Sequence, residues 1–173
     1  MKKACIVFCL LFIIILTAAL ALPSDGGSQF LRLHVRANSD GAADQAVKYA
    51  VKEAVVECLL PVAASCESKE EAMAAVEASL GAIERAADAV LAAEGFSYTS
   101  RAELKREEFP TRVYDGVTLE AGVYDALIVS LGTGAGANWW CVVYPPLCFA
   151  GEGTGDVRYA SRIAEIIRDF FGG

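Results

Sequence analysis

The stretch GTGAGANWWCVVYPPLCF, from Gly132 to Phe149, carries the most conformationally specific residues of this 173-residue chain. It combines three spaced glycines with a tryptophan pair, two cysteines and a proline pair. The apolar run from Trp139 to Tyr144 predicts a short strand, and the glycines before it predict a connection with positive φ. Trp139 and Trp140 then point to opposite sides of that strand, so that one can enter the core while the other faces solvent or covers a groove. We expect this stretch to form the functional surface of the protein.

The rest of the chain divides into segments of strand and helix periodicity. Alternating patterns predict strands over Phe30 to Ala37 and Tyr98 to Phe109, and the apolar stretch Tyr124 to Leu131 predicts a well-buried strand. Asp115-Gly116 predicts a hairpin between the Tyr98 to Phe109 strand and a fourth strand, Val117 to Leu119. Helical stripes predict three helices. The first follows the turn Asn38 to Gly41, with Asp40 as its cap, and ends at or just before Pro61. The second opens at the capping box Ser68 to Glu71 and ends at Gly95, and the third contains Val157 to Phe171. The expected fold is α+β, a single domain with a largely antiparallel sheet and helices packed on one face.

The N-terminus has the pattern of a targeting segment. Lys2 and Lys3 precede an unbroken apolar run from Ala4 to Leu22, which ends in a small-x-small cleavage pattern. We predict a signal peptide or membrane anchor over residues 1–22, a flexible linker over 23–29 and a single domain over 30–173. A cleaved signal is favoured, although about 19 apolar residues could also span a bilayer. Both alternatives place the domain outside the cytoplasm.

The charge of the chain limits its partners. The formal net charge is −7, and removal of residues 1–22 takes away two lysines and no acid, which leaves 13 basic against 22 acidic residues. Such a balance argues against nucleic acid and against an anionic membrane surface, because both require a basic face. The expected partner is a protein or a small molecule.

Export makes disulfides available to the four cysteines that lie beyond the targeting segment, in three connectivities. An extended chain would hold Cys141 and Cys148 about 23 Å apart, so a bridge between them requires a turn. Pro145-Pro146 supplies a corner, with one cis bond as an option. We favour Cys141–Cys148; a second bridge from Cys58 to Cys66 and simple packing of Cys58 both stay open. Zinc is poorly supported, since the chain has one histidine and no CxxC.

Catalytic groups are sparse. His34 is the only histidine and lies on the polar side of its predicted strand, so we expect a surface or half-buried residue there. Asn38, Asp40 and Asp44 could hold a hard cation, but helix capping is the favoured role of Asp40. The glycine stretch lacks the helix and the Lys-Ser/Thr of a phosphate-binding loop. We predict neither a metal nor a cofactor.

Four blocks of sequence carry a family resemblance. LRLHVRANSD, DQAVKYAVKEAV, FPTRVY and GVYDALIVSLGTGAGANWWCVVYPPLCF occur in that order, and NWWC-x-x-x-PPLC is the most specific of them. Together they resemble the stage II sporulation protein R family from Phe30 to about Phe149. Cys58 and Cys66 lie outside this pattern. The candidate partner-binding residues lie within these blocks: Trp139, Trp140, Asn138, Pro145, Pro146, His34, Asp40 and Arg112.

The resemblance implies a function that periodicity could not show. Members are exported from the forespore into the space between the two septal membranes. There they activate a membrane-embedded aspartic protease in the mother-cell membrane, which processes the precursor of sigma factor E. The protein would thus be a signalling ligand and not an enzyme. The competing hypotheses are a cell-envelope hydrolase that uses carboxylates and a peptidoglycan-binding protein.

Overall fold

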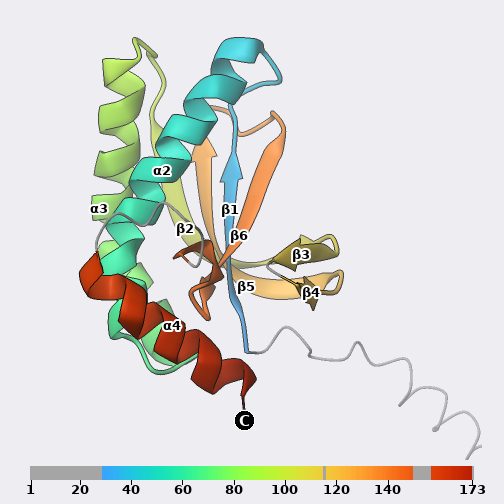
Figure 1. The fold of residues 1–173 in the computed structure, drawn as a ribbon. Coiled ribbons are helices and arrows are strands. Elements are labelled where there is room, and N and C mark those ends of the chain that lie inside the picture. Colours follow the sequence, from blue (N-terminus) through green and yellow to red (C-terminus); the bar gives the residue numbers. More distant parts are fainter. Residues whose placement is uncertain (1–28, 115, 150–156, 173) are drawn as a thin grey trace, which may run out of the picture.

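The computed structural model describes residues 29–114, 116–149 and 157–172 (Figure 1). The predicted targeting segment over residues 1–22 lies outside these residues. The strands are Leu31–Arg36 (β1), Ser100–Phe109 (β2), Arg112–Tyr114 (β3), Val117–Leu119 (β4), Gly122–Leu131 (β5) and Asn138–Tyr144 (β6). The helices are Ala42–Ser65 (α2), Lys69–Ala93 (α3) and Val157–Phe171 (α4), with a 3-10 turn at Leu147–Phe149 (η1). The predicted α+β class is confirmed.

The main sheet has the order β2-β5-β1-β6. β2 pairs antiparallel with β5, and β6 pairs antiparallel with β1. The central pair, β1 and β5, is parallel and places Leu33 beside Leu127. The sheet is therefore mostly antiparallel, as predicted. Pattern alone could not reveal the parallel pair, because both of its strands are buried in the middle of the sheet.

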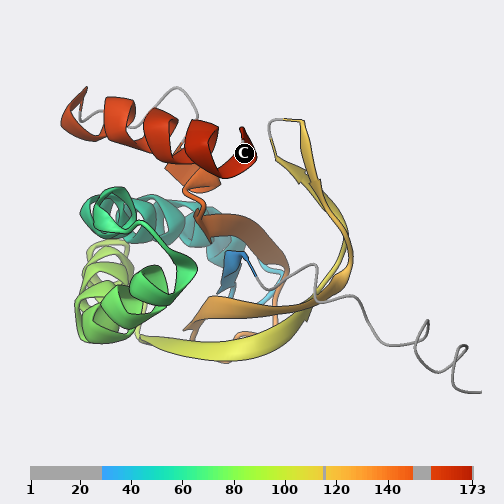
Figure 2. The same ribbon diagram turned by 90° about the horizontal axis from the view of Figure 1, so that it is seen from below.

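α2 and α3 lie side by side on one face of this sheet (Figure 2). The core between them consists of aliphatic side chains from β1, β5 and both helices, including Leu33, Val51, Ile83, Leu127 and Val129, all 0% exposed. α4 lies next to α2, at the end of the sheet where η1 follows β6 (Figures 1 and 2). The β3–β4 hairpin extends from the other face.

The helix boundaries follow local chemistry at three of the four ends of α2 and α3. Ser68 accepts a hydrogen bond from the Glu71 amide at 3.2 Å, which confirms the predicted cap of α3. Gly95 adopts φ 80°, and the Phe96 amide donates to the Leu91 carbonyl at 2.9 Å, an arrangement that closes the end of the helix. α2 begins after Gly41, whose conformation supplies the N-cap without a side-chain hydrogen bond. The prediction that Asp40 caps this helix is wrong.

The predicted end of α2 at Pro61 is also wrong, because the helix continues to Ser65 with Pro61 inside it. A proline within a helix costs a hydrogen bond and about 3 kcal/mol. Leu60, Ala63 and Ala64 around it are all buried. Burial of these apolar side chains offsets the local cost, and Pro61 itself stays exposed.

Candidate functional site

The loop that leads into β6 is fastened to the turn that follows β1. Asn38 Oδ1 accepts a hydrogen bond from the Thr133 amide at 3.0 Å, and the Gly136 amide donates to the Ala37 carbonyl at 2.9 Å. Asp40, predicted as a helix cap or cation ligand, accepts a hydrogen bond from the Ala137 amide at 2.7 Å. The NSD turn and the glycine stretch, 95 residues apart in sequence, therefore form one hydrogen-bonded unit at the start of β6.

Glycine is required in this unit for two reasons. Gly132 and Gly134 have φ of 55° and 63°, which confirms the predicted positive-φ connection. A Cβ on Gly136 would lie 2.2 Å from the carbonyl oxygen of Ser39, closer than atoms can approach. The loop thus depends on glycine both for its dihedral angles and for its contact with the turn.

Asp44 joins this unit to the rest of the domain. Its carboxylate accepts hydrogen bonds from Ser39 Oγ at 2.5 Å, Tyr98 Oη at 2.5 Å and Asn38 Nδ2 at 2.9 Å. The hydrogen bond from Ser39, followed by those from Tyr98 and Asn38, lowers the pKa of Asp44. The carboxylate is thus held ionised in a structural network. The sequence suggested Asp44 as one of three possible ligands of a hard cation, and its role as the centre of this network was missed.

The two tryptophans point to opposite faces of the sheet, as predicted, and both are half-buried. Trp139 packs against the helix-side core, and Lys52 Nζ of α2 lies 5.4 Å from the centre of its ring. Trp140 lies on the other face and stacks on His34, with ring centroids 5.5 Å apart. The guanidinium of Arg112, from the β3–β4 hairpin, lies 4.3 Å from the Trp140 ring. Each tryptophan therefore carries a cation above its ring.

We call the face opposite α2 and α3 the Trp140 face. Under the hairpin it contains Arg32, which is 0% exposed. The Arg32 guanidinium lies 4.4 Å from the Phe109 ring centre and 4.8 Å from that of Tyr124, and Nη2 donates to Tyr114 Oη at 2.8 Å. Burial lowers the pKa of Arg32, with the Tyr114 hydroxyl acting in the opposite direction. Aromatic rings thus surround this cation where a carboxylate would be expected.

His34 is the next residue along this face and is 3% exposed, so the prediction of a surface or half-buried residue is wrong. Trp140 and Phe109 cover its ring. Its Nδ1 lies 3.3 Å from Glu107 Oε1, and Glu107 also forms an ion pair with Arg36. Burial lowers the pKa of His34, while Asn138 and Glu107 oppose that effect. Because its ordinary pKa is about 6.5, a lowered value leaves the ring neutral at neutral pH.

The corner after β6 has the predicted form. Cys141 and Cys148 are bridged, with their Cα atoms 5.7 Å apart, and the Tyr144–Pro145 peptide is cis. Pro145 and Pro146 are buried, so they shape the corner from within. Cys58 and Cys66 are free, and the bridge between them that we left open is not formed. The Cys66 thiol instead donates to the Val62 carbonyl at 3.1 Å.

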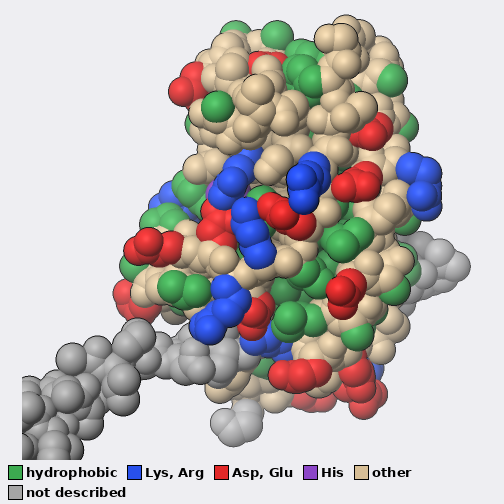
Figure 3. Space-filling view, turned by 180° about the vertical axis from the view of Figure 1, so that it is seen from behind, with side chains coloured by type: hydrophobic (Ala, Val, Ile, Leu, Met, Phe, Trp, Pro, Cys, Tyr) green, Lys and Arg blue, Asp and Glu red, His purple; other side chains and the backbone are tan. Residues whose placement is uncertain are grey.

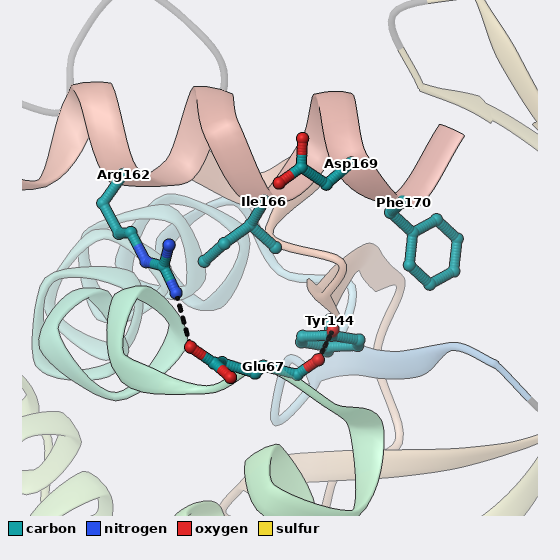
Figure 4. Close-up of a pocket in the computed structure, with 6 residues that line it drawn as sticks. All are labelled: Glu67, Tyr144, Arg162, Ile166, Asp169 and Phe170. Atoms are coloured by element: carbon teal, nitrogen blue, oxygen red, sulfur yellow. Dashed lines mark hydrogen bonds and ion pairs between the residues drawn. The ribbon is translucent and has the colours of Figure 1, made fainter. Parts of the chain in front are cut away.

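A pocket of about 410 Å³ lies between α4, the α2–α3 connection and the end of β6 (Figure 4). Arg162 of α4 faces Glu67 across it at 3.2 Å, and Tyr144 Oη donates to the Glu67 carbonyl at 2.7 Å. Ile166 and Phe170 supply the apolar wall. These contacts join α4 to the α2–α3 connection, and the Tyr144 ring, 6.0 Å from that of Phe170, joins α4 to the end of β6.

The structure brings four of the eight predicted partner-binding residues together, on the Trp140 face: His34, Arg112, Asn138 and Trp140. Asn138 is exposed and pairs with Arg36 in the sheet register. Of the others, Trp139 lies on the opposite face, Asp40 holds the loop, and the prolines lie beyond the far end of β6. Five buried or half-buried residues of this face were not predicted as part of the site: Arg32, Glu107, Phe109, Tyr114 and Tyr124. The alternation of β1 marked Arg32 as solvent-facing, and nothing in the pattern showed that a hairpin covers it.

The described residues hold neither a cluster of metal-ligating side chains nor a membrane-spanning helix. No group of three or more His, Cys, Asp or Glu side chains in residues 29–114, 116–149 and 157–172 could hold a metal ion. No helix in the same part of the chain is long and apolar enough to cross a membrane.

Comparison with known proteins identifies the family of the chain. The family model described as stage II sporulation protein R matches residues 27–153. The stage II sporulation protein R of Bacillus subtilis (strain 168) is 31% identical over 168 residues, covering 90% of this chain and 75% of the relative. No solved structure gives a significant match. The chain belongs to the stage II sporulation protein R family.

Proposed function

We propose that the protein is exported from the forespore and acts as a signal between the two cell compartments. Its partner is the membrane-embedded aspartic protease of the mother-cell membrane, which it activates to process the precursor of sigma factor E. Family membership is the single observation that carries this proposal. The protein acts as a ligand, and the protease supplies the catalytic groups.

The Trp140 face supports a role in contact with a protein. It presents a half-buried tryptophan beneath an arginine, beside the exposed Asn138. Tryptophan and arginine are the residue types most enriched where truncation costs a protein interface the most energy. The disulfide and the fastened loop hold β6 at both ends, so little order has to be gained on binding.

Co-expression of the full-length chain with the protease and the sigma precursor tests the proposal. We expect processed sigma factor only when all three are present. If no sigma factor is processed although export of the chain is confirmed, the proposal is refuted.

Trp140→Ala tests the contact surface in the same assay. We expect it to reduce processing at least tenfold while the domain stays folded, because a central interface tryptophan contributes about 2 kcal/mol or more. Phe171→Ala is the matched control, since Phe171 is an aromatic residue that is 42% exposed on α4. If Trp140→Ala and Trp139→Ala only lower the melting temperature and leave processing intact, the tryptophans serve the core alone.

A further inference from the structure

The two edges of the main sheet differ in chemistry. β2 forms one edge with the sequence SRAELKREEF, in which charges of both signs alternate with few apolar residues. Figure 3, seen from behind, shows acidic and basic side chains intermingled on that side of the molecule. β6 forms the other edge with NWWCVVY and has no charged residue. Charged edges resist pairing with a further strand, and uncharged apolar edges invite it.

Only the first part of the β6 edge is open. Asn138 is exposed and Trp139 and Trp140 are half-buried, whereas Val142 and Val143 are 0% exposed. η1 and α4 lie alongside the far end of the strand (Figure 2). Among the described residues, no loop, turn or cap hydrogen bond uses the backbone of residues 138–144. Alternate backbone groups on the outer side of an edge strand point away from the sheet, and here they are available for pairing.

The open part of this edge has a cation on each side. Arg112 lies over Trp140 on one face of the sheet, and Lys52 lies near Trp139 on the other. Lys52 also pairs with the exposed Glu53, an arrangement of little energetic weight at a surface. In the described part of the chain no carboxylate lies within ion-pair distance of Arg112. A chain with a net charge of −7 therefore presents its two tryptophans between two positive charges.

We propose that residues Asn138 to Trp140 bind an extended, acidic segment of a partner protein by strand addition. This inference rests on the proposed function for the identity of the partner, which is an extracytoplasmic segment of the protease. Backbone hydrogen bonds to the β6 edge supply affinity, and acidic side chains that reach Arg112 and Lys52 set the register.

The geometry specifies where the acids must lie. An added strand runs about 4.8 Å from β6, and its successive side chains point to opposite faces. A carboxylate that reaches Arg112 therefore occupies the position next to the one that reaches Lys52. Two consecutive acidic residues satisfy both cations, whereas two acids separated by one residue lie on the same face and satisfy only one.

The two tryptophans are the only ones in the chain, so their fluorescence reports directly on this edge. The probe is the capped peptide Thr-Val-Thr-Glu-Glu-Thr-Val-Thr, titrated into the purified full-length chain in mild detergent at low salt. We expect a saturable change in tryptophan emission. Binding should be at least tenfold weaker with Lys-Lys in place of Glu-Glu, and severalfold weaker with the acids spaced as Glu-Thr-Glu. No saturable change up to millimolar peptide, or equal binding of the acidic and basic peptides, overturns the inference.

A charge reversal on the protein completes the test. Arg112→Glu should weaken binding of the acidic peptide about tenfold and strengthen binding of the basic one, because a repulsive pair replaces an attractive pair. Arg101→Glu is the matched control, since Arg101 is 78% exposed on the opposite edge strand; it should leave both affinities unchanged. Equal effects of the two substitutions would show long-range charge alone and overturn the assignment of the site.

This experiment does not involve the protease, so its failure is distinct from failure of the proposed function. If the chain binds the acidic peptide but never promotes processing, the strand-addition proposal stands and the proposed function is refuted. If the chain promotes processing but does not bind the peptide, the proposed function stands and the strand-addition proposal is refuted. Self-pairing of β6, seen as a dimer by light scattering that acidic peptide does not dissociate, also overturns the proposal.

Discussion

Gly136→Ala should destabilise the protein by far more than one methyl group suggests. The added Cβ would lie 2.2 Å from the Ser39 carbonyl oxygen and 2.4 Å from the Ser39 carbonyl carbon, both of which are backbone atoms. No rotamer change can relieve a clash with backbone. The loop and the NSD turn must therefore separate by about 1 Å to restore ordinary van der Waals contact.

That separation breaks the hydrogen bonds that hold the loop in place. The Gly136 amide donates to the Ala37 carbonyl at 2.9 Å, and the Ala137 amide donates to Asp40 at 2.7 Å. A lost hydrogen bond costs about 0.5–1.5 kcal/mol, or about 1.5–3 kcal/mol where one partner is charged. The expected loss is roughly 2–4 kcal/mol, a large share of the ~5–15 kcal/mol that stabilises a typical domain.

Urea unfolding, followed by both tryptophan fluorescence and far-ultraviolet circular dichroism, measures this loss. With a slope of about 2 kcal/mol per molar, the middle of the usual range for urea, the midpoint should fall by roughly 1–2 M. Gly81→Ala is the control, because Gly81 lies inside α3 and its Cβ would meet only the flexible end of Arg85 at 3.4 Å. It should stabilise the protein by up to about 1 kcal/mol. A Gly136→Ala variant as stable as the wild type would refute the idea that the loop and turn form one rigid unit.

Two further predictions concern protonation and the disulfide. Burial lowers the pKa of His34 in the folded state. The unfolded state therefore binds more protons as the pH falls below about 6.5, and the free energy of unfolding should decrease from pH 7 to pH 5. His34→Gln should remove this part of the pH dependence, and an unchanged slope would contradict the assignment. Replacing both Cys141 and Cys148 by serine should cost about 2–3 kcal/mol in thermal or urea unfolding, the value for a short closed loop. When both proteins are measured in a reducing buffer, the difference between their free energies of unfolding should be much smaller, because the wild type then lacks the bridge as well.

Strong local signals predicted most of the secondary structure. The capping box at Ser68, the helix-ending glycine at position 95 and the turn at Gly116 each involve residues within a few positions of one another. The predicted partner of β4 was wrong, because β4 pairs with the short strand β3 while β2 pairs with β5. The Cys141–Cys148 bridge spans seven residues across a proline corner, so it too was within reach of local reasoning. Local chemistry decides these features, and a sequence displays local chemistry directly.

Predictions failed where distant segments decide the outcome. Asp40 is of a residue type and at a position typical of a helix cap. Its carboxylate instead accepts a hydrogen bond from the Ala137 amide, 97 residues later in the sequence. Pro61 has the strongest helix-breaking signal in α2, and burial of its neighbours overrides it. The polar side of β1 suggested exposure, yet Arg32 and His34 lie beneath rings from β2, the β3–β4 hairpin, β5 and β6. Alternation shows which side chains share a face and does not show what covers that face.

The recognisable sequence blocks of the family therefore contain two kinds of residue, which different experiments can separate. Asn38, Asp40 and Gly136 build the support for β6, and substitutions there should lower stability and activation together. Arg112 and Asn138 face outward at the edge that the support holds in place. Substitutions at those two positions should lower activation and leave the unfolding midpoint almost unchanged, because they remove few buried contacts. A motif that appears uniform along the sequence thus divides, in the fold, into a framework and the edge that it presents.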